Sequence, residues 1–269
     1  MGIRDSSLTR VVPVFNQLYS GDSTGQTWLL QLLAGLKGGN AGHQADLETP
    51  GEIQAIHFGA FEIKLTAPHS LLNWLLEYAD SNWGQKTLAR NSRLSSQTRQ
   101  YREKLFTRDR ETISLAQQKL AEADLSKPAW FILEGQTQPD LFVMTARILL
   151  VIEGKRTEWG PTLSTEYMPL RPQIIRHLDA AWEIRGDRQV FGGFLVEGTD
   201  AEPLELPKVW QETCRDTLSF DTLKAALPHR SPEERQSLSQ GFLGAMTWQK
   251  LCQQLGLVFN ALPDTLADQ

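Results

Sequence analysis

The sequence predicts an α/β protein, and three observations lead to this class. The apolar fraction is 41% and the charged fraction 22%, which is typical of a globular chain with a packed core. The 269 residues are enough to bury such a core without disulfides or metals. Between residues 97 and 200, apolar runs of strand length alternate with stretches of helical periodicity. We therefore expect a mixed sheet with helices packed against it.

The N-terminal region, residues 1–96, is predicted to be mostly helical. Apolar residues at 28–33 and at 71–76 are spaced as in helices, and Ser70 is a plausible N-cap for the second. Residues 61–65 alternate between apolar and polar and are predicted to form a strand.

Residues 97–200 are predicted to form the core. No glycine or proline interrupts residues 97–123, which favours one long helix. Apolar runs of strand length follow at Ala129–Leu133, Leu141–Met144 and Ile148–Ile152.

A helix and a fourth strand complete this core. Pro172 stands where proline is preferred at a helix start, and the apolar residues after it share one helical face. Gln189–Val196 has the pattern of a strand. The expected order is helix, three strands, helix and strand, followed by a helical C-terminal region at 201–269.

Charge and cysteine content limit the class of protein. The net charge of −5 excludes a protein that is basic overall, but residues 83–110 carry eight basic and two acidic side chains. This stretch is either a solvated face or a surface that contacts phosphates. Cys214 and Cys252 belong to no metal motif, and so few thiols favour a reduced, cytoplasmic protein. The apolar runs are too short to span a bilayer, so no membrane association is expected.

Two acidic residues are expected to face each other at one end of a predicted hairpin. If its strands pair about a turn at 146–147, Met144 faces Leu149 and Asp140 faces Glu153. Residues paired in this way have Cβ atoms about 5 Å apart, and two carboxylates at that distance repel each other unless a cation lies between them.

Lys155 adds an ammonium group to this end of the hairpin. It shares a strand face with Glu153, whereas Gly154 points the other way. Carboxylate oxygens are suitable ligands for Mg²⁺, and a metal held by them could activate water against a phosphodiester. The structural alternative is a surface salt bridge between Glu153 and Lys155, which would contribute at most about 1 kcal/mol. That alternative leaves the position of Asp140 unexplained.

Pro139-Asp140 and Glu153-Gly154-Lys155, in this order of elements, resemble the motif of the PD-(D/E)XK nuclease superfamily, also called restriction-endonuclease-like. The resemblance covers about residues 97–198, and two short runs in it also resemble a bacterial subgroup of the superfamily. It implies that Asp140, Glu153 and the Gly154 carbonyl hold Mg²⁺ or Mn²⁺. It also implies that Lys155 positions or polarises the attacking water.

The same resemblance suggests further site residues. Gln173 stands where some members carry a catalytic glutamine on the helix after the hairpin. His177 lies one turn later, where the members that carry this glutamine often have tyrosine. Glu134 could be an extra metal ligand. For all three, an ordinary structural role is the alternative.

The short motifs also occur elsewhere in the chain. Pro263-Asp264 is a second PD pair, and Glu62-Ile63-Lys64 is a second ExK. An alternative site would combine Asp46 or Glu48 with Glu62 and Lys64, but it lacks an apolar partner strand at a suitable distance.

The expected function is that of a metal-dependent nuclease acting on DNA, although nothing in the sequence separates DNA from RNA. The alternative is a nucleic-acid-binding or protein-interaction module on the same fold without catalysis. The overall acidity favours salt-sensitive binding, or help from a protein partner or a second copy of the chain. The arginines expected to contact nucleic acid are Arg93, Arg99, Arg102, Arg156, Arg171 and Arg176.

Overall fold

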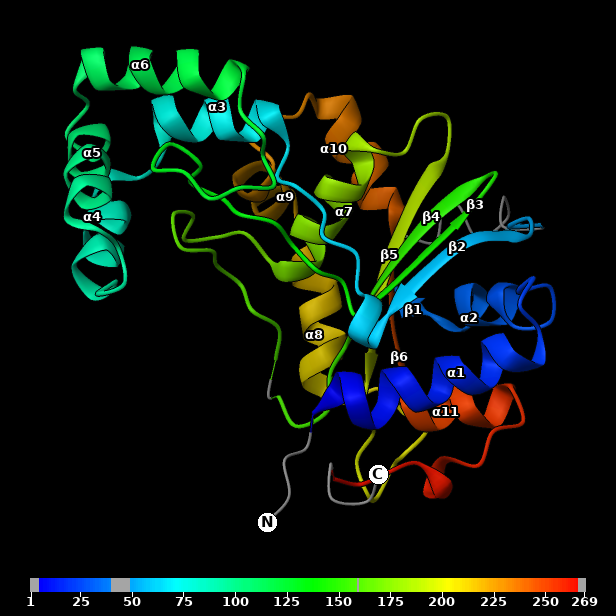
Figure 1. Ribbon diagram of the computed structural model, residues 1–269. Helices are drawn as coiled ribbons and strands as arrows, with labels where there is room; N and C mark the ends of the chain where they lie inside the picture. Colours follow the sequence, from blue (N-terminus) through cyan, green and yellow to red (C-terminus); the bar gives the residue numbers. More distant parts are fainter. Residues whose placement is uncertain (1–4, 40–48, 159, 266–269) are drawn as a thin grey trace.

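The computed structural model describes residues 5–39, 49–158 and 160–265, and a mixed β-sheet forms its centre (Figure 1). The six strands lie in the order β1-β6-β5-β4-β3-β2. Strands β4, β5 and β6 are parallel to one another, and β2, β3 and β4 form an antiparallel run. The strands are β1 (Lys37–Gly38), β2 (Ile53–Phe58), β3 (Leu141–Thr145), β4 (Ile148–Gly154), β5 (Gln189–Val196) and β6 (Phe242–Thr247).

Helices cover both faces of this sheet, so the α/β class is confirmed. All seven residues of β4 are buried, as expected for a strand with both faces covered. One face packs against helices α1 (Val12–Gly21), α2 (Leu29–Gly35) and α11 (Trp248–Gln254). The other face packs against α7 (Gln173–Glu183), α8 (Lys208–Thr217), α9 (Phe220–Ala226) and α10 (Pro232–Gly241).

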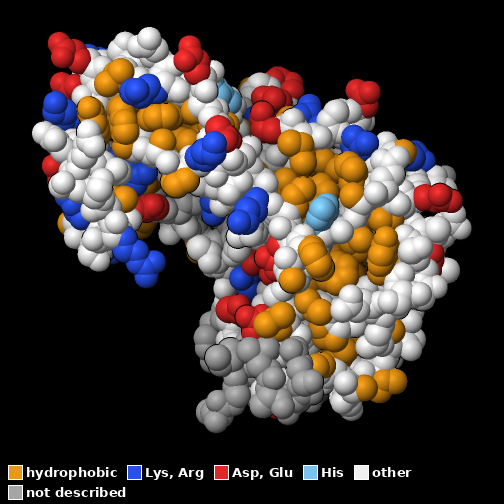
Figure 2. Space-filling model, viewed as in Figure 1, with side chains coloured by type: hydrophobic (Ala, Val, Ile, Leu, Met, Phe, Trp, Pro, Cys, Tyr) orange, Lys and Arg blue, Asp and Glu red, His pale blue; other side chains and the backbone are white. Residues whose placement is uncertain are grey.

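A separate group of helices, which we call the helical lobe, stands beside the sheet with its own apolar core (Figure 1). It consists of α3 (His69–Tyr78), α4 (Ser81–Arg90), α5 (Ser96–Phe106) and α6 (Arg110–Ala121). Figure 2 shows a hollow between this lobe and the body that contains the sheet, with acidic and basic side chains at its inner end.

The predicted single helix at 97–123 is wrong, because the chain breaks it into α5 and α6. Arg108 adopts a left-handed backbone conformation with φ 64°. Asp109 then caps α6 by accepting a hydrogen bond of 2.8 Å from the Thr112 amide. The predicted cap at Ser70 is also wrong, since α3 begins at His69 after Pro68.

The strands predicted at 141–144, 148–152 and 189–196 are confirmed, and so is the hairpin register, in which Met144 faces Leu149. The strand predicted at Ala129–Leu133 is wrong. This segment packs on the helical lobe instead, where the Trp130 ring stacks on Tyr101 at 4.4 Å between centroids.

Strand β2 takes the place beside β3 and ends at Phe58, so the strand predicted at 61–65 is wrong as well. The sheet therefore includes β2 and β6, which lie outside residues 97–200. The predicted C-terminal helices are present as α8 to α11, with β6 inserted among them.

Three short helices complete the described elements: a π-helix at Ser7–Val11 and 3₁₀ turns at Gly59–Phe61 and Phe259–Ala261. Among the described residues, no helix has the length and apolar character needed to cross a bilayer. Cys214 and Cys252 are both free and buried.

Candidate active site

Asp140, Glu153 and Lys155 come together at the carboxyl end of β4. Asp140 directly precedes β3, Glu153 lies at the end of β4 where it pairs with β5, and Lys155 follows β4. The carboxyl ends of parallel strands are the usual location of sites in open α/β sheets. The chain leaving this point crosses to the helical lobe, where Tyr167 is buried.

Glu153 is buried and has hydrogen-bond partners on both oxygens. The Oε1 atom lies 2.8 Å from Lys155 Nζ and accepts a hydrogen bond of 2.7 Å from Gln173 Nε2. The Oε2 atom lies 2.9 Å from His177 Nε2. Burial alone would raise the pKa of Glu153, but His177 and Lys155 outweigh it and hold the pKa below its usual value. Glu153 is therefore ionised at neutral pH.

Gln173 and His177 lie on the first turns of α7, and the structure brings both of them beside Glu153. The other ring nitrogen of His177 also has a partner, because Nδ1 lies 2.8 Å from Thr137 Oγ1. Thr137 is held in turn by two backbone hydrogen bonds with Leu65, of 2.8 and 2.9 Å. This chain of contacts fixes the orientation of the Glu153 carboxylate.

Asp140 differs sharply from Glu153 in its electrostatic state. Its Oδ2 accepts one hydrogen bond of 2.7 Å, from the Gly154 amide. Burial and the negative charge of Glu153 raise the pKa of Asp140 to about 8. Burial and the neighbouring Glu153 charge therefore favour the protonated form of Asp140 at neutral pH.

The donor set fits a hard divalent cation. The amide and carbonyl of Lys155 are both bonded to β5, so the alternation of a strand turns the Gly154 peptide groups towards Asp140. The Gly154 carbonyl thus lies on the Asp140 side, and carboxylate and carbonyl oxygens are the donors that Mg²⁺ takes, commonly one or two carboxylates with several waters. The described residues contain no group of three or more His, Cys, Asp or Glu side chains arranged to hold a metal.

Lys155 remains an ammonium group in this setting. Burial would lower its pKa, but the charge of Glu153 and the hydrogen bond to it outweigh burial and raise the pKa. A lysine in this state donates hydrogen bonds at neutral pH and does not act as a base.

Glu62 also lies near this site. The sequence did not predict this position of Glu62. It follows the turn after β2, and its charge raises the pKa of Asp140. Burial raises the pKa of Glu62 itself; a hydrogen bond from Ser7 opposes the rise, and the charge of Glu153 adds to it. The ExK motif at 62–64 could have indicated this residue, but only with the knowledge that β2 pairs with β3.

Glu134 does not belong to this group, so its assignment as a metal ligand is wrong. Its buried carboxylate is bound by Arg171, whose Nε lies 2.8 Å from Oε2. Arg171 also lies 2.8 Å from Asp179 and donates a 2.7 Å hydrogen bond to the Ala226 carbonyl. Asp179 is bound in addition by Arg230. Glu134 is thus part of a buried ion-pair network.

Most of the arginines expected to contact nucleic acid have structural roles. Arg171 is fully buried, and Arg102 is 8% exposed and donates to the Tyr167 hydroxyl, so both predicted contacts are wrong. The Arg156 side chain is 3% exposed and paired with Asp264 and Glu197. Arg176 donates to two carbonyls of the loop before Thr137.

Arg93 and Arg99 remain near the surface of the helical lobe. Arg93 is exposed, whereas Arg99 is half-buried and donates to the Leu88 and Asn91 carbonyls. In the alternative site, Asp46 and Glu48 lie outside the described residues.

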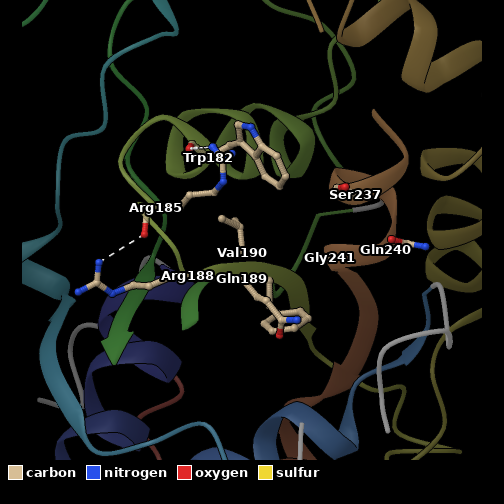
Figure 3. A pocket seen from close by; sticks show the side chains of 9 residues that line it. Trp182, Arg185, Arg188, Gln189, Val190, Ser237, Gln240 and Gly241 are labelled. Atoms are coloured by element: carbon tan, nitrogen blue, oxygen red, sulfur yellow. Dashed lines mark hydrogen bonds between the residues drawn. The ribbon is translucent and has the colours of Figure 1, made fainter. Parts of the chain in front are cut away.

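A separate pocket of about 300 Å³ lies at the opposite end of β5 (Figure 3). The Arg185 guanidinium stacks 3.6 Å from the centroid of the Trp182 ring beside it. Val190 of this pocket and Leu195 beside Gly154 are five residues apart, or about 16 Å along a strand. The pocket is therefore not part of the acidic site.

No family model matches the chain, and no curated protein or solved structure is significantly similar to it. The resemblance to the PD-(D/E)XK superfamily therefore stays a prediction from the residues.

Proposed function

We propose that the protein is a metal-dependent nuclease with its active site at Asp140, Glu153 and Lys155. The observation that carries the proposal is the position of these side chains: Asp140 and Glu153 lie at the adjoining ends of β3 and β4, and Lys155 Nζ lies 2.8 Å from Glu153 Oε1. A structural salt bridge needs only Glu153 and Lys155, whereas a cation site needs both acids. The order β3, β4, α7 and β5, with β2 beside β3, supports the restriction-endonuclease-like core that the resemblance implies.

Each residue has a role that follows from its contacts. Asp140, Glu153 and the Gly154 carbonyl would hold Mg²⁺, which supplies Lewis-acid activation of water and of the phosphate when bound. His177 and Gln173 hold the Glu153 carboxylate in one orientation. Lys155 donates hydrogen bonds to the attacking water or to a phosphate oxygen, where negative charge develops.

The helical lobe provides a surface for the nucleic-acid backbone. Its exposed basic residues include Lys86, Arg90, Arg93 and Lys104, on α4, α5 and the loop between them. Basic side chains appear on the part of this lobe that borders the hollow in Figure 2. Such side chains bind phosphates without reading the base sequence. DNA is the proposed substrate, and the two free cysteines agree with a reducing cytoplasm.

Purified protein should cleave DNA with Mg²⁺ or Mn²⁺ and stop when EDTA is added. With Ca²⁺ it should bind DNA without cleaving it, because calcium prefers a looser and larger coordination shell. Gel analysis of labelled single- and double-stranded DNA in the four buffers measures both results. Cleavage that continues in EDTA would contradict a metal-dependent site.

Reversing the exposed charges of the lobe should weaken DNA binding. The Lys86→Glu, Arg90→Glu and Arg93→Glu triple variant should lower the slope of log K against log salt by about 0.7 to 0.9 for each phosphate that it no longer binds. Fluorescence anisotropy between about 50 and 200 mM salt measures this slope. The control is Lys208→Glu, Arg215→Glu and Lys224→Glu, which changes the net charge equally at exposed positions on α8 and α9, outside the lobe. Equal slopes for the two triple variants would mean that the basic residues of the lobe form a solvated face and do not bind phosphates.

The second candidate is a binding module without catalysis. It is favoured by the complete set of partners around Glu153, since both of its oxygens already have hydrogen-bond partners within the chain. Under this alternative, DNA binding depends on the lobe but not on Mg²⁺, and no buffer yields cleavage.

A further inference from the structure

An exposed aromatic ring follows the end of β2, the strand that pairs with β3 next to Asp140. Phe61 is 80% exposed, more than any other large hydrophobic residue in the part of the chain that the structure describes. It directly precedes Glu62, whose charge acts on Asp140. Phe58, the last residue of β2, pairs with Leu141, which directly follows Asp140, and Phe61 comes three residues after Phe58. At about 3.8 Å between consecutive Cα atoms, the Phe61 backbone lies within about 12 Å of Phe58, so its ring can reach a base one or two nucleotides from a phosphate held at the site.

The turn that carries Phe61 is fixed in place. Gly59 has φ +60°, and a side chain at this position would overlap Val12 of α1, so the turn packs directly on that helix. His57 Nδ1 lies 3.2 Å from the Phe61 carbonyl. Ser7 donates a hydrogen bond of 3.1 Å to Glu62 on the other side. The backbone is thus anchored before and after a ring that faces solvent.

We propose that Phe61 is a stacking platform for an unpaired base of the substrate, next to the phosphodiester that is cleaved. This inference rests on the proposed nuclease function and adds a substrate class, single-stranded nucleic acid or an unpaired end. An exposed ring on an anchored backbone offers a π-face to any base. A base within a duplex already has both faces stacked, so it cannot use this ring without leaving the helix.

The test compares binding to single-stranded and duplex DNA of one sequence, in Ca²⁺ so that cleavage does not interfere. The strand carries 2-aminopurine, whose fluorescence is quenched by stacking. Phe61→Ala should bind the single strand about 5- to 100-fold more weakly than the wild type, because base–aromatic stacking contributes that much per base. It should also lose most of the quenching, while duplex affinity stays within about twofold. Phe61→Trp should restore both signals.

Phe220→Ala is the matched control, because Phe220 is 72% exposed at the start of α9. It should leave affinity and quenching unchanged. Thermal melts check that both variants remain folded. If Phe61→Ala matches the wild type on single strands, or weakens duplex binding equally, the stacking role is wrong.

The two proposals fail in different ways. A wild-type protein that cleaves DNA while Phe61→Ala behaves normally overturns the role of Phe61 alone. A wild-type protein that neither binds nor cleaves DNA overturns the nuclease function and the stacking role together.

Discussion

At pH 8, Asp140→Asn should be more stable than the wild type by about 2 to 5 kcal/mol, because one pKa unit corresponds to about 1.4 kcal/mol. Asp140 has a pKa of about 8 in the folded protein, above its ordinary value. The folded state therefore holds a proton that the unfolded chain has lost, and wild-type stability falls as the pH rises from about 4 to about 8. Asparagine cannot titrate, so this loss disappears in the variant.

Urea denaturation from pH 5 to pH 8 measures the effect, and the difference should grow with pH. Asp216→Asn, at an exposed position of α8, should stay within about 0.5 kcal/mol of the wild type. The same Asp140→Asn protein should lose DNA cleavage by about 10²- to 10³-fold, since it lacks a carboxyl group that could give up its proton and bind the metal as a carboxylate. A variant that is less stable than the wild type at pH 8 would mean that Asp140 forms a structural ion pair.

Arg171→Ala should destabilise the fold by about 3 to 5 kcal/mol, because removing one partner of a buried ion pair leaves an uncompensated charge. The charges left behind would be Glu134, whose remaining partner Arg176 lies 3.5 Å away, and Asp179, which keeps Arg230 and His229 as partners. Urea denaturation at pH 7 measures the loss. The comparison is Arg93→Ala, which removes an exposed arginine and should change stability by less than about 0.5 kcal/mol.

DNA binding separates a structural role of Arg171 from the contact that the sequence suggested. Under conditions where Arg171→Ala is still folded, its DNA affinity should equal that of the wild type. A variant with wild-type stability and weakened DNA binding would show that Arg171 contacts phosphate after all.

The sequence was most informative where the chain is regular and local. The β3–β4 hairpin has a short turn, so its register followed from the apolar pattern and brought Asp140 near Glu153. The bounds of β5 also agree with the prediction. In both places the side-chain pattern and the backbone favour the same structure.

Contacts between distant segments were less predictable. Ala129–Leu133 has the composition of a strand, but its aromatic residues pack on the helical lobe. Strand β2 pairs with β3 although it lies more than 80 residues earlier in the chain. Because the sequence did not indicate this pairing, the position of Glu62 near Asp140 was not predicted. Periodicity also gives no information on whether an arginine is buried. Arg102 and Arg171 were therefore assigned to the surface although the structure buries them against acceptors.

The proposed metal site is tested most directly by a crystal grown with Mn²⁺ and measured for anomalous scattering. We expect a single strong peak about 2 Å from carboxylate oxygens of both Asp140 and Glu153, with the Gly154 carbonyl as a further ligand. The peak should be absent from crystals of Asp140→Asn grown in the same solution. A wild-type map with no manganese between the two carboxylates, and with Glu153 still bound by Lys155, Gln173 and His177, would contradict the metal-dependent site.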